Sequence, residues 1–222
     1  MRRAVIVVIA FAAAAVAAAP VGATNECRGL KVCVPVVGPW VVADRAAQVS
    51  FQLSCPAKFV VAGLDAELSR AGVDVTFRGS LGSPVNPGIT TSRSAEFLAR
   101  LLAGVTPATF RPHIGCVPAS GGGQRFPTVH QAVPPDSPLV PAAVQLVFTP
   151  GVHRFVERCS AGKRLIGATH AVGFYGAAPP SAALVRSVVV AQIVQAGIVH
   201  LLVRAGPLPG ARAIVQVDLA CA

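Results

Sequence analysis

The chain has 222 residues, of which 53% are hydrophobic and only 13% are charged, and its formal net charge at neutral pH is +10. This composition excludes an intrinsically disordered protein, because disordered chains are poor in hydrophobic residues. The 21 glycines and 19 prolines, together with many valines, favour extended strands joined by turns.

Residues 1–23 have the layout of a secretory signal peptide. Two arginines precede the apolar run of residues 4–19, and small residues lie at the positions that signal peptidase recognises before Ala23. We therefore predict cleavage after Ala23 and export of the remaining chain, whose net charge is +8. An uncleaved membrane anchor is the alternative, because about 20 apolar residues suffice to span a bilayer. The proline and glycine just before Ala23 favour cleavage.

The first half of the exported chain is predicted to be mainly β. Val49, Phe51, Leu53 and Cys55 alternate with polar residues along positions 49–55. Such alternation predicts a strand with one buried and one solvent-exposed face. Similar apolar or alternating runs predict further strands at residues 40–43, 59–62, 73–78 and 110–116.

Residues 94–104 are the one place where a helix is predicted, so the fold should contain at most one short helix. Ser94 is a suitable N-cap residue. Four apolar side chains then recur at helical spacing, namely Phe97, Leu98, Leu101 and Leu102.

Glycine-rich and proline-rich sequence occupies residues 119–138. Glycine lends a chain flexibility and proline lends it stiffness, so this segment is predicted to be a linker. It divides the exported chain into a first β unit at residues 25–118 and a second β unit at residues 139–222.

The second half is also predicted to be β. Strands are expected at residues 144–148, 165–167 and 215–221. The apolar stretch of residues 184–203 is long enough to suggest a membrane span, but Arg186 and His200 are among the polar residues that interrupt it. We therefore predict two buried strands that turn at Ala196 and Gly197.

Six cysteines follow the predicted signal peptide, and an even number in an exported chain predicts disulfide bonds. Metal ligation is the alternative, but the chain has no C-x2-C pair and export favours oxidation. The stretches SCPAKFVVAG (54–63) and RCSAGKRLIG (158–167) both place a cysteine eight residues before a glycine. Two pairs of cysteines are separated by 61 and 62 residues, and the remaining pair closes a small loop; the predicted bonds are Cys55–Cys116, Cys159–Cys221 and Cys27–Cys33.

This spacing predicts a mainly β protein of two tandem disulfide-closed units, each resembling a small sandwich or barrel. Chain-entropy arithmetic assigns about 4 kcal/mol to each long bridge and about 2 kcal/mol to the short one. His113 and Asp218 each lie three residues before the cysteine that closes a unit. We interpret them as equivalent polar positions on two equivalent strands.

The search for catalytic motifs finds none. The G-x-S-x-G elbow, the HExxH motif and the glycine-rich phosphate loops are all absent, and the five histidines are not at zinc-site spacing. Asp65 and Glu67 are the nearest carboxylate pair, and we expect them on a solvated strand face. We therefore predict no catalytic, cofactor-binding or metal-binding residues and no cofactor.

The function that these observations favour is a secreted, non-catalytic binding or structural protein of the cell envelope or extracellular space. Its basic charge suits an anionic cell-envelope polymer or another secreted protein. No aromatic residues interleave with the basic ones, which argues against specific nucleic-acid binding, and membrane association is less favoured. The alternative is a secreted hydrolase whose catalytic residues meet only in the folded chain. A serine or aspartate within hydrogen-bond reach of a histidine in a cleft would favour that alternative.

Overall fold

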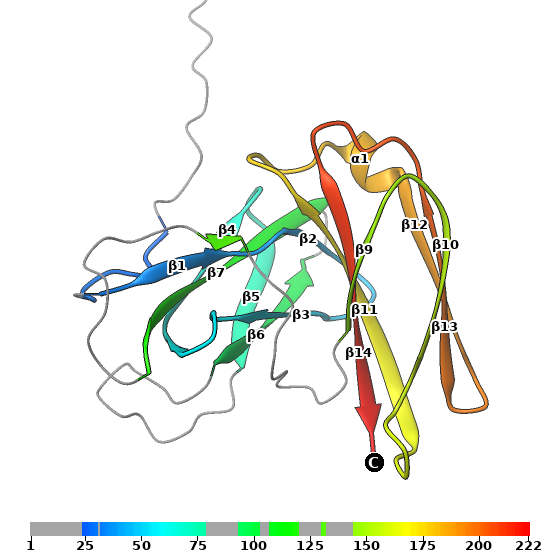
Figure 1. Cartoon of the computed structure of the whole chain (residues 1–222). Coiled ribbons are helices and arrows are strands. Elements are labelled where there is room, and N and C mark those ends of the chain that lie inside the picture. Colours follow the sequence, from blue (N-terminus) through cyan, green and yellow to red (C-terminus); the bar gives the residue numbers. More distant parts are fainter. Residues whose placement is uncertain (1–23, 31, 79–92, 103–106, 120–129, 132–143) are drawn as a thin grey trace, which may run out of the picture.

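The computed structural model describes residues 24–30, 32–78, 93–102, 107–119, 130–131 and 144–222. In this part of the chain the structure is mainly β, with one short helix (Figure 1). The predicted signal peptide lies outside the described residues, and so does most of the predicted linker. We refer to the described residues before 120 as the first half and to those after 143 as the second half.

The largest sheet has eight strands and takes members from both halves. Its strands are β1 (Val34–Val37), β2 (Trp40–Ala43), β4 (Phe59–Leu68), β7 (Ala108–Pro118), β8 (His130–Gln131), β9 (Val144–Phe148), β11 (Leu165–Tyr175) and β14 (Arg212–Cys221). Strand β7 pairs with β4 along one edge and with β1 and β2 in succession along the other. Strand β2 then pairs with β11, β11 with β14, and β14 with β9. The pairing of Trp40 with Phe174 and of Val41 with Gly173 therefore makes the sheet continuous between the halves.

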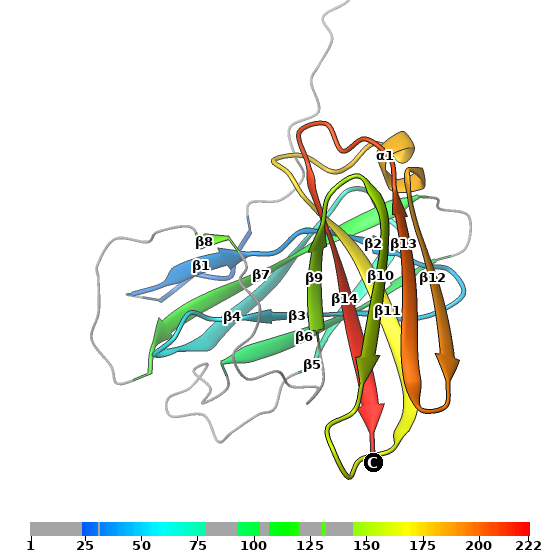
Figure 2. The same ribbon diagram turned by 45° about the vertical axis from the view of Figure 1, so that its right-hand side comes forward.

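Two three-stranded antiparallel sheets pack against this large sheet. One lies in the first half and is ordered β3 (Val49–Ser54), β6 (Ser94–Leu101), β5 (Val73–Arg78). The other lies in the second half and is ordered β10 (Gly151–Arg158), β13 (Ile198–Ala205), β12 (Val188–Gln195). Figure 1 shows β10, β13 and β12 as a separate layer beside β9, β14 and β11, and Figure 2 shows the three strands of this layer running side by side.

Each three-stranded sheet encloses its own hydrophobic core. In the first half Phe51 and Phe97 meet Phe110 and Ile114 of β7, and all four are fully buried. In the second half the buried core includes residues of β13 and β14, namely Val199, Leu201, Val203, Val215, Val217 and Leu219. Burial of branched and aromatic side chains on these faces is the main force that holds the layers together.

The strands predicted at residues 40–43, 73–78 and 144–148 are confirmed with those bounds, and those at 49–55, 110–116 and 215–221 have slightly different ends. The strands predicted at 59–62 and 165–167 are present but much longer, because they continue as Phe59–Leu68 and Leu165–Tyr175. One expectation about the strand at residues 49–55 is wrong. Its polar face was expected to meet solvent, yet Gln52 of that face is fully buried and Ser54 is nearly so. Strands of the second half cover this face, and no local pattern reports such a cover.

The helix predicted from Ser94 is also wrong, because Ser94–Leu101 forms the central strand β6. Phe97 and Leu101 are four residues apart, a spacing that puts them on one face of a strand as well as of a helix. Pairing with β3 on one side and β5 on the other then decides in favour of the strand. Leu102, which belonged to the expected helical stripe, is half exposed.

The apolar stretch of residues 184–203 contains the expected hairpin. Strands β12 and β13 turn at Ala196 and Gly197, both of which have positive φ. Of the two, β13 is buried along one face, whereas β12 is mostly exposed. The short helix α1 (Ala182–Arg186) precedes them and begins at Ser181, whose hydroxyl accepts a hydrogen bond from the Leu184 amide at 3.2 Å. Among the described residues there is no helix of the length and hydrophobicity that crossing a membrane requires.

Candidate binding surface

Three disulfide bonds join the predicted pairs of cysteines. Cys55 lies directly after β3 and is bonded to Cys116 of β7, with 5.7 Å between the Cα atoms. Cys159 lies directly after β10 and is bonded to Cys221 of β14, with a Cα separation of 5.9 Å. Each of these bonds therefore connects a three-stranded sheet to the large sheet.

The third bond, between Cys27 and Cys33, closes a loop that lies on the large sheet. We call the described residues 24–30, 32 and 33 the N-terminal loop. Its Glu26 passes so close to β4 and β7 that a Cβ atom added to Gly63 or Gly115 would overlap the Glu26 carbonyl oxygen. The Asn25 amide also donates a hydrogen bond to the Asp65 carboxylate at 2.5 Å. Two glycines thus leave room for the loop, and the disulfide holds it in place.

A buried histidine lies under this loop. His113 has its Nδ1 atom 3.6 Å from Glu26 Oε1 and its Nε2 atom 3.7 Å from Glu67 Oε2. Arg111 Nη1 lies 3.9 Å from the same Glu67 oxygen. Burial acts to raise the pKa of Glu26, but its contact with His113 and a backbone hydrogen bond act in the opposite direction, and the pKa lies below its usual value.

This cluster corrects the expectation that Asp65 and Glu67 lie on a solvated strand face. Glu67 is about 17% exposed and faces Arg111 and His113, while Asp65 holds the Asn25 amide. The ion pairs and hydrogen bonds of this group close the loop onto the sheet. We therefore assign the cluster of Glu26, Glu67, Arg111 and His113 a structural role.

A second polar cluster lies where the halves meet. Gln216 of β14 is fully buried, and its Oε1 atom accepts hydrogen bonds from the Gln52 amide at 3.2 Å and from Gln145 Nε2 at 2.9 Å. Its Nε2 atom donates to Asp218 Oδ1 at 3.1 Å. These bonds hold the covered face of β3 against β14 and β9.

Two carboxyl groups approach each other at the edge of this junction. Ser50 donates a hydrogen bond to Glu96 Oε1 at 2.6 Å, and Glu96 and Asp218 are both nearly buried. Burial raises the pKa of Asp218 to about 6, the hydrogen bonds from Ser50 and Gln216 oppose the rise, and the nearby charge of Glu96 adds to it. The two side chains line a cavity of about 320 Å³. Sequence reasoning missed this pair because its members are 122 residues apart and carry no motif.

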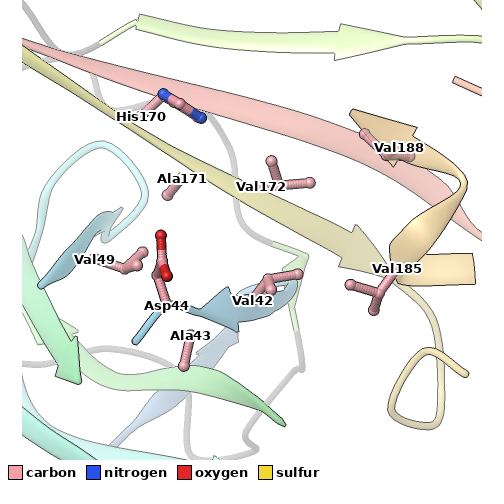
Figure 3. A pocket seen from close by; sticks show the side chains of 9 residues that line it. All are labelled: Val42, Ala43, Asp44, Val49, His170, Ala171, Val172, Val185 and Val188. Carbon is pink, nitrogen blue, oxygen red and sulfur yellow. The ribbon is translucent and has the colours of Figure 1, made fainter. Parts of the chain in front are cut away.

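A smaller hollow of about 210 Å³ lies beside His170 (Figure 3). Seven of its nine lining residues have apolar side chains, and the full set is Val42, Ala43, Asp44, Val49, His170, Ala171, Val172, Val185 and Val188. The His170 Nδ1 atom is hydrogen-bonded to Gln192 Oε1 at 2.9 Å, and Asp44 Oδ1 accepts from the Ala46 amide at 3.0 Å. The hydrogen bonds of His170 and Asp44 thus stabilise the neighbouring strand and turn.

The other described histidines have different surroundings. His153 Nε2 lies 2.7 Å from the Thr149 carbonyl oxygen, and His200 is exposed on β13. None of the rings of His113, His153, His170 and His200 has a serine hydroxyl at hydrogen-bond distance. Within the same residues, no group of three or more His, Cys, Asp or Glu is placed to hold a metal ion.

Several exposed apolar residues lie on the outer face of the sheet β10–β13–β12. Strand alternation sends Val199, Leu201 and Val203 into the core and the neighbouring residues outward. The strand registers place the outward residues on one surface, which we call the open face. It comprises Val152, Arg154, Val156 and Arg158 of β10, Ile198, His200, Leu202 and Arg204 of β13, and Val189, Ala191, Ile193 and Gln195 of β12.

The open face combines exposed apolar groups with positive charge. Val152 is 59% exposed and Ile193 is 62% exposed, and Val156 and Val189 are similar. Arg154, Arg158 and Arg204 stand among them, and the face contains no acidic residue. A flat surface of branched apolar side chains and arginines is suited to contact with an anionic, partly apolar partner.

Comparison of the chain with protein-family models, with curated proteins and with solved structures finds no match. The function therefore has to be argued from the residues and their geometry.

Proposed function

We propose that this protein is a secreted, non-catalytic binding protein built from two copies of one disulfide-closed β unit, and that the open face binds an anionic partner. The observation that carries the proposal is the open face itself, a three-stranded sheet surface with three arginines, one histidine, exposed valines and isoleucine, and no acid.

The strand pairings support two copies of one unit. In the first half β7 pairs with β2 and β4, and β6 pairs with β3 and β5. In the second half β14 pairs with β9 and β11, and β13 pairs with β10 and β12. The registers also correspond. Ser50 and Arg154 each lie five residues before a cysteine, and they pair with Leu98 of β6 and Leu202 of β13 respectively. We call the two sets of strands the first and second unit.

Export is supported by the cysteines. All three disulfides are formed, and disulfides persist in oxidising compartments outside the cytosol. The signal peptide predicted at residues 1–23 supplies the route. Both observations support the proposal that the binding surface acts outside the cell.

A binding role is favoured because the open face differs from its counterpart in the first unit. The corresponding positions on β3 and β6 include Ser50, Gln52 and Glu96, which are covered by strands of the second unit. Among the residues that the structure describes, no strand covers the same side of β10, β13 and β12. Its apolar side chains are therefore available to a partner, and its arginines select an anionic one.

Charge reversal tests this proposal. We expect the double variant Arg154→Glu, Arg204→Glu to bind a sulfated polysaccharide at least tenfold more weakly than wild type. The control variant Arg164→Glu, Arg186→Glu makes the same charge change at exposed arginines outside the face, and we expect it to retain most of the wild-type affinity. Isothermal titration at two salt concentrations measures both, and higher salt should weaken wild-type binding. Equal losses in the two double variants would show a general charge effect and overturn the assignment of the face.

The Glu96 and Asp218 pair favours a second candidate, the secreted hydrolase. A carboxyl group with a raised pKa beside a second carboxyl group is the arrangement that supplies a general acid and its partner in glycoside hydrolysis. Assays on a set of generic glycans would support it if both Asp218→Asn and Glu96→Gln abolished a measurable activity. Inactivity of the wild-type protein on all of them would leave the binding proposal alone.

A further inference from the structure

We propose that the N-terminal loop is a cap that prevents head-to-tail association of this chain, because it covers the sheet face on which the open face of a second copy would dock. This inference rests on the relation between the two units proposed above. It concerns self-association, whereas the proposed function concerns an anionic partner.

The junction inside the chain shows how such docking is built. The outer side of the first unit's three-stranded sheet, with Ser50, Gln52 and Glu96, lies against β14 of the second unit. Gln216 and Asp218 of β14 meet these residues. One unit thus offers a three-stranded sheet, and the next unit offers the face of β11 and β14.

The first unit has its own version of that second face, formed by β4 and β7. Counting back from the closing cysteines, His113 and Gly115 of β7 correspond to Asp218 and Ala220 of β14. Gly63 of β4 corresponds to Gly167 of β11, each lying eight residues after a cysteine.

The N-terminal loop occupies this version of the face. Glu26 meets His113 at 3.6 Å and passes directly over Gly63 and Gly115. At the equivalent place in the second unit, Asp218, Gly167 and Ala220 face Ser50 and Glu96 of the preceding unit. The loop therefore lies where a preceding unit would dock.

The fit of the loop is specific to the first unit. A Cβ atom at Gly63 would overlap the loop backbone, whereas a Cβ atom at Gly167 would have its nearest neighbour, the Ala220 Cβ atom, at 3.8 Å. The loop is also held by the Asn25 bond to Asp65 and by its own disulfide. These contacts would have to be released before a second copy could reach the sheet.

Charge and sheet geometry favour a second copy as the occupant. The open face carries Arg154, Arg158 and Arg204 and no acidic residue, while the face of β4 and β7 carries Asp65 and Glu67 beside Arg111 and His113. Two open faces would repel each other, so a symmetric dimer through this face is disfavoured. A contact between two different faces leaves one face of each kind free in a pair of molecules, so association would continue to longer chains or to a closed ring. Strands β9 and β4 each pair along one edge in the described residues, so their other edges could extend the junction that β2 and β11 make.

The test opens the loop without shortening the chain. The variant combines Glu26→Arg, which places a cation beside Arg111 and His113, with Cys27→Ser and Cys33→Ser. In sedimentation velocity across a concentration series, we expect wild type to remain monomeric and the opened variant to form species whose mass grows with concentration. Adding Arg154→Glu and Arg204→Glu should restore the monomer, and adding Arg164→Glu and Arg186→Glu should not.

Three results would overturn the inference: a wild-type chain that already associates through the open face, a folded opened variant that stays monomeric, or association that ignores the open-face arginines. Near-ultraviolet circular dichroism and the two remaining disulfides identify a folded variant. If the triple variant does not fold, Glu26→Arg alone, which keeps the disulfide, provides the same comparison. If the opened variant stays monomeric but still binds the polysaccharide, the cap is rejected and the proposed function stands.

Discussion

The pKa of Asp218 is changed by the contact between the two units. This residue lies in the second unit, yet Ser50 and Glu96 of the first unit act on its carboxyl group. Burial at this junction raises its pKa from 3.8 to about 6, so the folded protein holds the proton more tightly than the unfolded chain does. Its counterpart His113 instead meets two carboxylates beneath the N-terminal loop.

The raised pKa of Asp218 predicts a pH dependence of stability. Between about pH 4 and pH 6 the folded state binds more protons at this site than the unfolded state, so the free energy of unfolding falls as pH rises. Asp218→Asn removes this titration and keeps an acceptor for Gln216. We expect the variant to equal wild type near pH 4 and to exceed it at pH 7 by up to about 3 kcal/mol.

Urea unfolding at a series of pH values measures the difference between the two proteins. Other carboxyl groups titrate in both, so their contributions cancel in the comparison. A constant difference across this pH range would show that Asp218 does not carry the shift.

At the scale of elements, β4 and β11 show how two strands with a shared sequence feature lie in different surroundings. Both follow a disulfide-bonded cysteine and both pass a glycine at the same place. The glycine of β4 lies beneath the N-terminal loop, while that of β11 has ordinary space around it. The same sequence feature therefore meets a structural need in one strand and not in the other.

This difference predicts opposite tolerance of a methyl group. Gly63→Ala or Gly115→Ala should lower the free energy of unfolding by about 1–3 kcal/mol, because the new Cβ atom would displace loop backbone. Gly167→Ala is the matched control and should change it by less than about 0.5 kcal/mol. Denaturant unfolding of the three variants provides the comparison, and equal effects at Gly63 and Gly167 would contradict the close packing of the loop.

The conformation of β6 cannot be determined from its own residues alone. Its apolar residues fit the spacing of a helix and of a strand alike, since Phe97 and Leu101 share a face in both. Pairing with β3 and β5 provides hydrogen bonds on both edges of the segment, and an isolated short helix would gain no such partners. Neighbouring strands therefore determine its conformation.

At the scale of the whole molecule, the two units are closely joined despite the predicted linker. Strand β2 pairs with β11, and Gln52, Gln145 and Gln216 form a hydrogen-bonded group across the junction. Separating the units would leave Gln216 and the amide of Gln52 without these partners and would expose the covered face of β3. Buried polar groups that lose their hydrogen bonds are costly, so the junction couples the units.

We therefore expect the protein with its disulfides intact to unfold in one transition. Differential scanning calorimetry should give a calorimetric enthalpy equal to the van't Hoff enthalpy. Two resolved transitions would show that the units unfold independently and that the junction contributes little.

The amino-acid sequence by itself determined the β class, the positions of most strands and the partners of the six cysteines. Strand signals depend on alternation between neighbouring residues, and the cysteine pairs follow from two nearly equal spacings along the chain. Both kinds of information are local or one-dimensional. The position of Trp40–Ala43 is an example, since its apolar run and its flanking proline and aspartate suffice to delimit it.

Only the tertiary structure decided which faces are covered and which are open. Gln52 and Ser54 have the pattern of a solvated face and become buried, and strands more than 90 residues later pack over this face. Three further features arise in the same way. Glu96 comes close to Asp218, the N-terminal loop packs on Gly63 and Gly115, and the arginines of β10 are exposed. Each depends on the packing of one sheet on another, which no pattern within a single strand encodes.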